Sequence, residues 1–323
     1  MRSVRRRGWS PKPDALELLE EHGGPFASAL YRQLWIEAFP EWRDASFAAQ
    51  APDGTVAAVA LLADGVVADS TPLNYGGIVA SRPLDAGEAR SFLQAARAAA
   101  GARSLEARAV PARPTSSTAH LGGAVGGWTS VVHLVPGSDL QARWRYSARR
   151  AIRRARRGGG EVRIGDDARP FAALYADASR EHWFRYPTDL LRRLASAGLG
   201  RCYDVCVDGV PVSSAFAVVS RDHWAWWLAA QNEVGRSLSA NYLAVASLLE
   251  DAQRHGVRAV NLGISAGMPG VAQFKRRFDA VPVPVISHRV GDARARVEAW
   301  THRSTWQLRR ATRRRRVSVR RRA

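Results

Sequence analysis

Short runs of alternating apolar residues occur twice along the chain, in the same order each time. In the first half two such runs flank Asp53-Gly54, and in the second half two runs flank Asp208-Gly209. Asp-Gly between apolar runs favours a hairpin, because glycine readily adopts positive φ. Each hairpin is followed by a further strand, a helix that ends at a glycine, and a closing strand. The expected elements are 46–49, 55–62, 65–69, 86–100 and 103–108 in the first half, and 202–207, 210–219, 223–230, 240–255 and 258–263 in the second.

This repetition predicts a duplicated strand–hairpin–strand–helix–strand unit, and therefore a mixed α/β protein with two similar lobes. Chance similarity between short β patterns is the alternative explanation. A length of 323 residues suits two lobes, and an apolar share of 46% is typical of a globular protein. We divide the chain into a basic N-terminal segment (1–13), a first lobe (14–138), a second lobe (139–290) and an Arg-rich, largely helical tail (291–323).

The second lobe begins with a strongly basic segment, Asp139–Arg157, which Gly158–Gly160 ends. Apolar residues recur within it at helical spacing, so it is predicted to form one amphipathic helix. They are Leu140, Trp144, Ala148, Ile152 and Ala155. Most of the remaining surface is arginine, without the alternating charge signs of a solvated helix face. Like charges at this spacing repel one another, so acids elsewhere in the fold or a bound anion must balance them.

The formal net charge is +19, and arginine supplies nearly all the positive charge because Lys12 and Lys275 are the only lysines. A GC-rich coding bias would replace lysine with arginine and lengthen basic tails without functional meaning. Alternatively, the charge attracts a polyanion such as tRNA, an anionic lipid headgroup or a nucleotide-linked substrate. Bias does not explain why arginine so outnumbers the acids, which favours contact with a polyanion. The basic tail either frays in solvent or contacts nucleic acid.

The sequence indicates a cytoplasmic protein. No run approaches the roughly 20 apolar residues that span a bilayer. Arg5–Arg7 are followed by no apolar run, so neither Sec nor twin-Arg export is indicated. Cys202 and Cys206 are the only cysteines, and four residues of strand place them about 13 Å apart, too far for a disulfide or a shared metal.

Six short segments between about residues 45 and 285 occur in a recognisable order. They are Ser70–Gly77 (STPLNYGG), Ser104–Arg108 (SLEAR), Trp144–Val162, Asn241–Leu243 (NYL), Asn261–Ser265 (NLGIS) and Gln273–Phe278 (QFKRRF). The ordered set resembles Fem-like proteins of the acetyltransferase (GNAT) fold, relatives of the FemAB-type peptidoglycan-bridge aminoacyltransferases. Asp279 departs from the pattern, since the family usually has glycine there.

The resemblance implies two tandem GNAT-like lobes with a cleft between them, in which an activated acyl group is transferred to an amine. It leaves the donor open. Acetyl-CoA enzymes of this fold hold the pyrophosphate on a Gly-rich loop that opens a helix. The corresponding segment here is Arg236–Asn241, in which Ser239 and Asn241 occupy the glycine positions. Their side chains crowd the phosphate, which disfavours acyl-CoA and suits the Fem-like donor, aminoacyl-tRNA.

Amide formation needs a near-attack pose, a neutral amine and stabilisation of the tetrahedral oxyanion. It requires no metal and no tightly bound cofactor, and no metal-ligand cluster is visible in the sequence. Lys275 is the first candidate, because a lysine in an Arg-using chain indicates a compact point charge. The similar family uses the lysine of this segment near the reacting ester, so we assign Lys275 to oxyanion or leaving-group stabilisation. An ordinary surface lysine is the alternative.

Four further residues are candidates for catalysis. Asn261 and Ser265 lie at a strand end, where they orient the amine, bind the acyl carbonyl or merely cap the strand. Glu106 and Asp69 lie at comparable places of the first lobe, where either accepts a proton or binds the acceptor. Candidate substrate-binding residues are Tyr75, Gly76, Gly77, Arg236, Asn241 and Tyr242. Candidate tRNA-phosphate contacts, on one face of the basic helix, are Arg145, Arg149, Arg153 and Arg156.

The sequence therefore predicts an N-acyltransferase whose donor is aminoacyl-tRNA, bound as a co-substrate. An acyl-CoA-dependent N-acetyltransferase is the first alternative, and a non-catalytic basic nucleic-acid-binding protein is the second. A cell-wall precursor, a sugar amine and a peptide-like natural product are all compatible acceptors. Peripheral membrane contact through the Arg-rich tail and the oligomeric state stay open.

Overall fold

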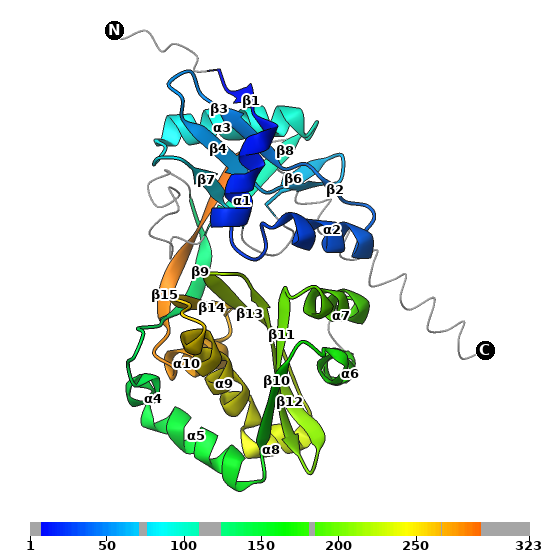
Figure 1. The fold of residues 1–323 in the computed structure, drawn as a ribbon, viewed down its shortest axis with the longest axis vertical. Coiled ribbons are helices and arrows are strands. Elements are labelled where there is room, and N and C mark those ends of the chain that lie inside the picture. Colours follow the sequence, from blue (N-terminus) through cyan, green and yellow to red (C-terminus); the bar gives the residue numbers. More distant parts are fainter. Residues whose placement is uncertain (1–7, 71–75, 110–123, 181–184, 266, 292–323) are drawn as a thin grey trace, which may run out of the picture.

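The computed structural model describes residues 8–70, 76–109, 124–180, 185–265 and 267–291. They form an elongated molecule with an N-terminal lobe above a second lobe (Figure 1). Tyr75 and the basic tail from residue 292 onward lie outside the described residues. No helix among the described residues is long and apolar enough to cross a membrane.

Both halves of the chain contain the predicted hairpin, further strand, helix and closing strand, together with elements that the sequence pattern did not predict. The first half contains β1 (Ser10–Pro11), a 3-10 turn (Pro13–Leu16), α1 (Glu17–His22), α2 (Ala29–Ala38), β2 (Arg43–Asp44), β3 (Phe47–Gln50), β4 (Val56–Val59), β5 (Leu62–Ala63), β6 (Val67–Asp69), β7 (Ile78–Ala80), α3 (Ala86–Ala99), β8 (Ser104–Ala109) and β9 (Ala124–His133). The second half contains α4 (Leu140–Arg143), α5 (Tyr146–Arg157), β10 (Glu161–Gly165), α6 (Arg169–Ala178), α7 (Thr188–Ser196), β11 (Gly200–Val207), β12 (Val210–Val219), β13 (His223–Gln231), α8 (Glu233–Leu238), α9 (Ala240–Arg254), β14 (Ala259–Ile264), α10 (Pro269–Arg276) and β15 (Val281–Val290).

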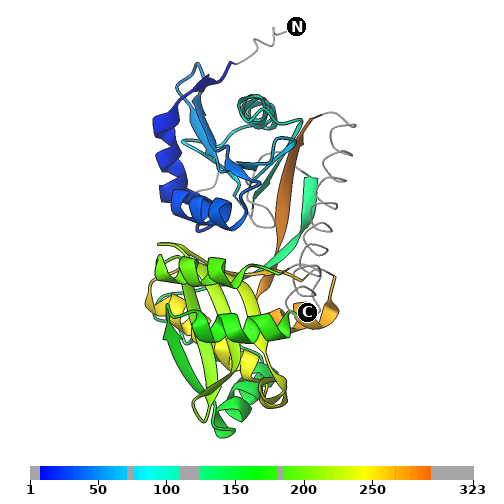
Figure 2. The same ribbon diagram turned by 90° about the vertical axis from the view of Figure 1, so that its right-hand side faces the viewer.

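The strands form two sheets, a four-stranded sheet in the order β1-β3-β4-β7 and an eleven-stranded sheet in the order β10-β11-β12-β13-β14-β9-β15-β8-β6-β5-β2. The larger sheet runs through both lobes, because the lobes exchange their closing strands. β9, which ends the first half, pairs with β14, whereas β15, which ends the second half, pairs with β8. Figure 2 shows these two strands spanning the space between the lobes, paired with each other.

The predicted duplication is present in the geometry. In the first lobe, β6 runs parallel to β8 over three paired positions that end at Asp69 and Glu106. In the second lobe, β13 runs parallel to β14 over three paired positions that end at Ala225 and Asn261. The helices before β8 and β14 both end at a glycine with positive φ, Gly101 or Gly256, as the sequence pattern indicates.

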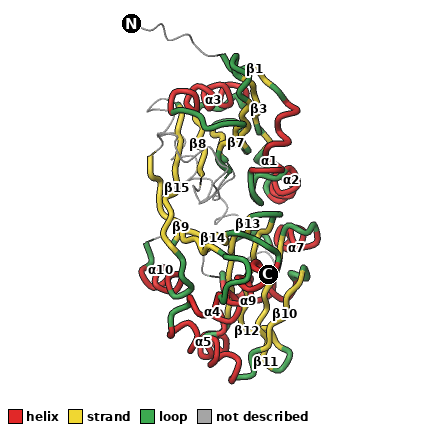
Figure 3. Tube along the Cα trace, turned by 60° about the vertical axis from the view of Figure 1, so that its left-hand side comes forward, coloured by secondary structure: helices red, strands yellow, loops and turns green. Residues whose placement is uncertain are grey.

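An aromatic core joins the lobes through α2 and α7, which lie side by side (Figures 1 and 3). Trp35 of α2 packs against Tyr186 with ring centroids 6.0 Å apart, and Tyr31 of α2 packs against Trp227 of β13 at 6.3 Å. These residues belong to one buried cluster that contains side chains from both lobes. The lobes are therefore connected by packing as well as by the exchanged strands.

The single helix predicted over Asp139–Arg157 is wrong, because the chain forms α4 and α5 with a break at Trp144 and Arg145. Both residues are extended, with ψ near 144° and 148°. The break lets the Trp144 indole pack edge-on against Phe278 at 5.4 Å, while the Arg145 backbone N–H donates to the Arg277 carbonyl at 2.9 Å. Tertiary contacts outweigh helix periodicity here, although the predicted apolar stripe is buried throughout.

Candidate functional site

The strands β13 and β14 diverge after their three paired positions. β13 continues to Gln231 beside β12, with a bulge that leaves Trp227 without a partner in the register. β14 continues to Ile264 beside β9. We call the opening between the diverging strands the β13–β14 fork. α10, the helix that carries Lys275, lies against this fork.

Lys275 is buried, with only 2% of its surface exposed. Its Nζ donates to the carbonyl oxygens of Gly263 at 2.8 Å and Ile264 at 3.0 Å, and lies 6.0 Å from the ring centroid of Trp226. No carboxylate of the described residues lies within ion-pair distance of it. Burial lowers the pKa of Lys275 to about 8. The ammonium thus bridges the two arms of the fork, where β14 supplies carbonyls and β13 supplies an aromatic face.

Two of the three N–H donors of the Lys275 ammonium are used by these carbonyls. One donor is left for another group, such as a developing oxyanion. The alternative of an ordinary surface lysine does not agree with this burial. The burial of this lysine costs free energy, because its ammonium has no counterion among the described residues.

Asn261 lies in the same fork and is held in place by two hydrogen bonds. Its Oδ1 accepts from Thr129 Oγ1 at 2.5 Å and from the Gly263 N–H at 2.8 Å. Its Nδ2 makes no hydrogen bond to the described residues, so the amide side chain is oriented with its donors available. Ser265 follows β14 directly, and its carbonyl accepts from the Met268 N–H at 2.8 Å. The structure thus brings Lys275, Asn261 and Ser265 together.

The start of α9 contacts the fork through aromatic packing. The Tyr242 ring lies 4.6 Å from that of Phe274 in α10, which in turn lies 5.8 Å from Trp226. The Tyr242 hydroxyl also accepts a hydrogen bond from Arg277. Asn241, one residue earlier, is half-buried and makes no side-chain contact of this kind among the described residues.

A helix, not a loop, precedes α9. α8 ends at Leu238 and is followed by Ser239, which has φ 59° and ψ 36°, and α9 begins at the next residue. The carbonyl end of α8, which carries the negative end of its dipole, therefore adjoins the N-terminus of α9. This arrangement differs from a glycine-rich phosphate-binding loop, in which only backbone N–H groups point at the anion.

Arg236 of α8 lines the larger of two described cavities, with a volume of about 890 Å³. The cavity lies between α6, the end of β13 and α8. Its polar lining includes Gln231, whose buried Oε1 has no hydrogen-bond partner in the described part of the chain, and the exposed carboxylate of Glu233. A volume of this size accommodates a small-molecule ligand. Gln231 is five residues beyond Trp226, about 16 Å along the strand, so the cavity is a neighbour of the fork rather than part of it.

Asp69, the last residue of β6, pairs in register with Glu106 of β8, and both are buried. Glu106 Oε1 accepts from Arg108 Nε at 2.9 Å and from Arg289 Nη2 at 3.1 Å. Val281, at the start of β15, and Asn261 of β14 both pair with Val131 of β9. Near the other end of β15, Arg289 pairs with Glu106 of β8. Eight residues of strand correspond to roughly 25 Å. These carboxylates therefore do not share a reacting centre with Lys275.

Gly76 and Gly77 let their backbone lie close to Ser70 and to the Arg108 carbonyl. Both N–H groups donate to the Arg108 carbonyl, at 3.1 and 2.6 Å. A Cβ at Gly76 would lie 3.0 Å from the Ser70 side chain, and Gly77 has φ 65°. Because their donors are engaged, substrate binding by this loop stays a prediction, as it does for Tyr75 outside the described residues.

The four arginines chosen on the basic helix have different surroundings. The Arg145 backbone begins α5, and Arg149 Nη1 donates to the Gln141 and Ala142 carbonyls at the end of α4. Arg153 lies 5.8 Å from the ring centroid of Tyr146, while Arg156 is exposed. Arg145, Arg153 and Arg156 are thus exposed and able to contact an anion, whereas Arg149 is held by the two carbonyls.

Sequence reasoning missed Thr129, Trp226 as a partner of Lys275, and the cavity residues other than Arg236. Thr129 is on β9, and no sequence signal places that strand beside β14. Trp226 lies in a Trp-rich strand in which alternation alone does not distinguish core from site. Gln231 follows an apolar run and carries no motif.

The comparisons with known proteins agree with this geometry. Residues 142–276 match the family model of the acetyltransferase (GNAT) domain. No curated protein sequence matches the chain significantly. Its fold is similar to that of FemX, with a TM-score of 0.60 and 12% identity over 84% of this chain and 93% of that chain.

Two further solved structures have a similar fold. The C-terminal domain of a candidate lysylphosphatidylglycerol synthetase from Agrobacterium fabrum gives a TM-score of 0.57 and 15% identity, covering 89% of this chain and 95% of that chain. L-PGS from Bacillus licheniformis gives 0.50 and 14%, covering 88% and 94%. At these identities the likeness concerns the fold. The prediction of a two-lobed, Fem-like GNAT fold is confirmed, and residues 142–276 of the second lobe match a GNAT acyltransferase domain.

Proposed function

Because residues 142–276 match a GNAT acyltransferase domain, we propose that the chain forms an amide at the β13–β14 fork, with aminoacyl-tRNA as donor. The observation that carries this proposal is Lys275, a buried ammonium with two carbonyl partners, no counterion among the described residues and one donor left over. A preorganised cation in a water-poor site stabilises charge that develops in the transition state.

The chemistry follows from the groups at the fork. A neutral amine of the acceptor attacks the carbonyl carbon of the aminoacyl ester, and negative charge develops on the carbonyl oxygen. Lys275 donates its remaining N–H to that oxygen. Asn261, fixed through its Oδ1, offers Nδ2 to the acyl carbonyl or the incoming amine. Collapse of the intermediate breaks the ester C–O bond, and the proton lost by the amine reaches the leaving ribose hydroxyl.

The α8–α9 junction favours the tRNA donor over acyl-CoA. A pyrophosphate at the start of α9 would meet the carbonyl end of α8 and the side chains of Ser239 and Asn241. Arg236 faces the adjacent cavity, and Arg277, a second cation near the start of α9, is bonded to the Tyr242 hydroxyl. An acyl-CoA N-acetyltransferase therefore remains the second candidate, supported by the family match itself.

The basic α5 supplies the second reason for a tRNA donor. Arg153 and Arg156 project from it with no carboxylate partner among the described residues. Phosphates of a nucleic acid would offset the repulsion within this helix. The fold likeness to FemX and to L-PGS is compatible with such a donor. Peripheral membrane contact by the basic tail belongs to the same proposal and depends on its arginines.

The acceptor is an amine whose remainder fits the cavity beside α6. The Glu233 carboxylate and the unpartnered Gln231 Oε1 both accept hydrogen bonds, as an amine- or amide-bearing acceptor requires. Since the cavity lies about 16 Å of strand from Trp226, the acceptor must be extended. This length favours a peptide-like or nucleotide-linked precursor over a small free amine.

The test is single-turnover transfer from labelled aminoacyl-tRNA to a pool of amine acceptors, with acetyl-CoA in a parallel reaction. Lys275→Met should lower the transfer rate at least a hundredfold while tRNA binding is unchanged. Lys12→Met is the matched control, since it removes the only other lysine, whose Nζ is 3.5 Å from Gln50 Oε1 in the first lobe. Transfer from acetyl-CoA alone would establish the second candidate, and binding without transfer to any acceptor would establish a non-catalytic protein.

The pH dependence of the same reaction tests the role of Lys275. If its ammonium stabilises the oxyanion, the rate should fall as the pH rises through about 8, because the group then loses its charge. A rate that instead increases through this pH would identify Lys275 as a base and contradict the assignment.

A further inference from the structure

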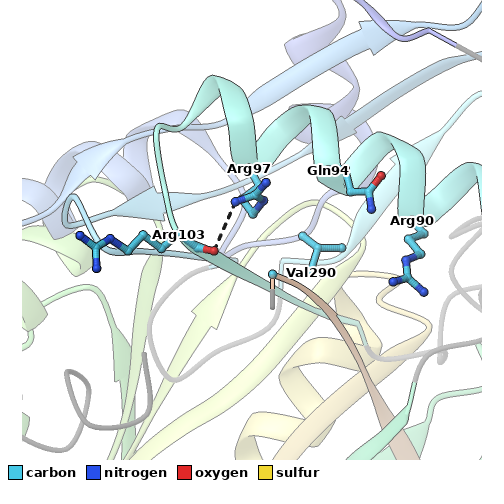
Figure 4. Close-up of a pocket in the computed structure, with 6 residues that line it drawn as sticks. Arg90, Gln94, Arg97, Arg103 and Val290 are labelled. Carbon is cyan, nitrogen blue, oxygen red and sulfur yellow. Dashed lines mark hydrogen bonds between the residues drawn. The ribbon is translucent and has the colours of Figure 1, made fainter. Parts of the chain in front are cut away.

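A second cavity lies on the first lobe, far along β15 from the β13–β14 fork. It has a volume of about 400 Å³ and lies between α3 and the end of β15 (Figure 4). Among the described residues, its lining consists of Arg90, Gln94, Arg97, Arg103, Val290 and Gly291. Three of these six are arginines, and none of the six is a carboxylate. The amide-forming site does not use any of them.

Arg97 is positioned by its own lobe. Its Nη1 donates to the carbonyl oxygens of Ala102 and Arg103, both at 3.3 Å. These bonds fix the guanidinium across the turn that leaves α3. Its Nε, in contrast, is buried and has no hydrogen-bond partner among the described residues. The Nε–Nη2 edge of Arg97 is therefore held in place and unused, and this edge has the geometry that binds two oxygens of one anion.

An unpartnered guanidinium nitrogen in a buried position is costly for a protein, because it has lost water and gained nothing. A bound oxyanion would remove this cost. The neighbouring side chains suit one. Gln94 lies four residues and Arg97 seven residues beyond Arg90 on α3, so all three share one helix face.

Figure 4 shows Arg90, Gln94 and Arg97 on the side of α3 that faces Val290, with the Arg103 carbonyl bonded to Arg97. Arg90 is exposed and has no ion-pair partner among the described residues. The Arg103 side chain extends away from the other three, so its backbone rather than its charge shapes the cavity.

Gly291 closes the opposite wall. Its φ is 127°, and a Cβ built on it would lie 3.0 Å from the Arg103 carbonyl oxygen. A larger residue would push the end of β15 away from this carbonyl, which also anchors Arg97. The position of Gly291 and the orientation of Arg97 therefore both depend on the Arg103 carbonyl.

We propose that this cavity is a binding site for the phosphate group of a small phosphorylated molecule. Arg97 binds two phosphate oxygens through Nε and Nη2, Arg90 supplies the second positive charge, and Gln94 donates from its amide. Two arginines balance a phosphate monoester, which carries close to two negative charges at pH 7. The site is independent of the proposed amide formation, since it lies on the other lobe.

Isothermal titration of the full chain with inorganic phosphate and pyrophosphate tests the proposal. Arg97→Lys keeps the charge but lacks the two-donor edge, and Arg90→Gln removes a side chain that bonds no described residue. We expect each to weaken pyrophosphate binding about tenfold. Arg221→Gln, an exposed arginine of the β12–β13 loop, is the control of equal charge change and should leave binding unchanged.

Equal weakening by Arg90→Gln and Arg221→Gln would overturn the proposal, because the arginines would then act only through net charge. A thermal melt of each variant separates lost binding from lost folding, and Arg90→Gln keeps the test valid if Arg97→Lys unfolds. Titration with a nucleoside diphosphate and with anionic vesicles separates the sources. If the variants lose binding to the nucleoside diphosphate, the result supports a small phosphorylated ligand. If they lose binding to the vesicles alone, the site binds a membrane surface and the proposal is refuted.

Discussion

The buried Lys275 predicts a stability change with pH that the rest of the fold does not share. In the folded chain burial lowers the pKa of this amine from 10.5 to about 8, whereas in the unfolded chain it has its ordinary value. Between these two pH values the unfolded state holds a proton that the folded state has released. Folding stability should therefore rise as the pH rises through this window.

The magnitude follows from the two pKa values. The full effect of a shift of about 2.5 units is about 3 kcal/mol, and the part that develops between pH 7 and pH 9 is about 1.3 kcal/mol. The side chain is 2% exposed, so solvent screening does not reduce this figure greatly. In a chain of this size the expected change in Tm is a few degrees.

The comparison with Lys275→Met isolates this effect, because every other titrating group is common to both proteins. Urea unfolding at pH 7, 8 and 9 should give a stability difference, native chain minus variant, that grows by about 1.3 kcal/mol over this range. A flat difference would refute the reasoning. It would mean that the carbonyls of Gly263 and Ile264 hold the charge strongly enough to cancel desolvation.

Two further changes test the tRNA contact and the packing of α8. Arg156→Gln should weaken tRNA binding and reduce the slope of log K against log salt by about 0.9. A filter-binding series at four salt concentrations measures this slope. The control Arg221→Gln should leave the slope unchanged if the contact is specific. Gly235→Ala should lower the free energy of unfolding, measured by urea denaturation, by about 2 kcal/mol or more, because a Cβ there would lie 2.1 Å from the Val212 carbonyl oxygen. The control Gly270→Ala, at a position with open space around it, should be neutral or slightly stabilising.

The repeat of hairpin, helix and strand was predictable because each copy carries local signals. The glycines after α3 and α9 and the alternation of the strands depend on neighbouring residues only. The break at Trp144 was not predictable, since it results from packing against Phe278, far away in sequence. The candidate residues at the end of β14 and in α10 were found from motifs, but their contact through the Gly263 carbonyl required the fold.

Asp279 illustrates how a departure from a family pattern is resolved. The family usually has glycine there, and the structure gives Asp279 φ 62°, a conformation that glycine adopts most readily and aspartate tolerates. Its carboxylate accepts from Arg143 Nε at 3.0 Å and from Nη2 at 2.5 Å. The side chain thus joins α4 to the segment after α10, which offsets the cost of the left-handed backbone.

The strand exchange makes the β13–β14 fork and the β6–β8 pair each depend on the other half of the chain. Thr129, on the strand that ends the first half, orients Asn261 in the second lobe. Arg289, on the strand that ends the second half, neutralises Glu106 in the first lobe. At equivalent places of the duplicated unit, the fork therefore holds a neutral amide whose Nδ2 bonds no described residue, beside a lysine, and the β6–β8 pair holds a buried carboxylate bonded to two arginines. The fork can receive a developing negative charge, whereas the β6–β8 pair already contains one. Under the proposed function, the duplication has thus kept one acyl-transfer site, whose geometry is set by residues from both halves.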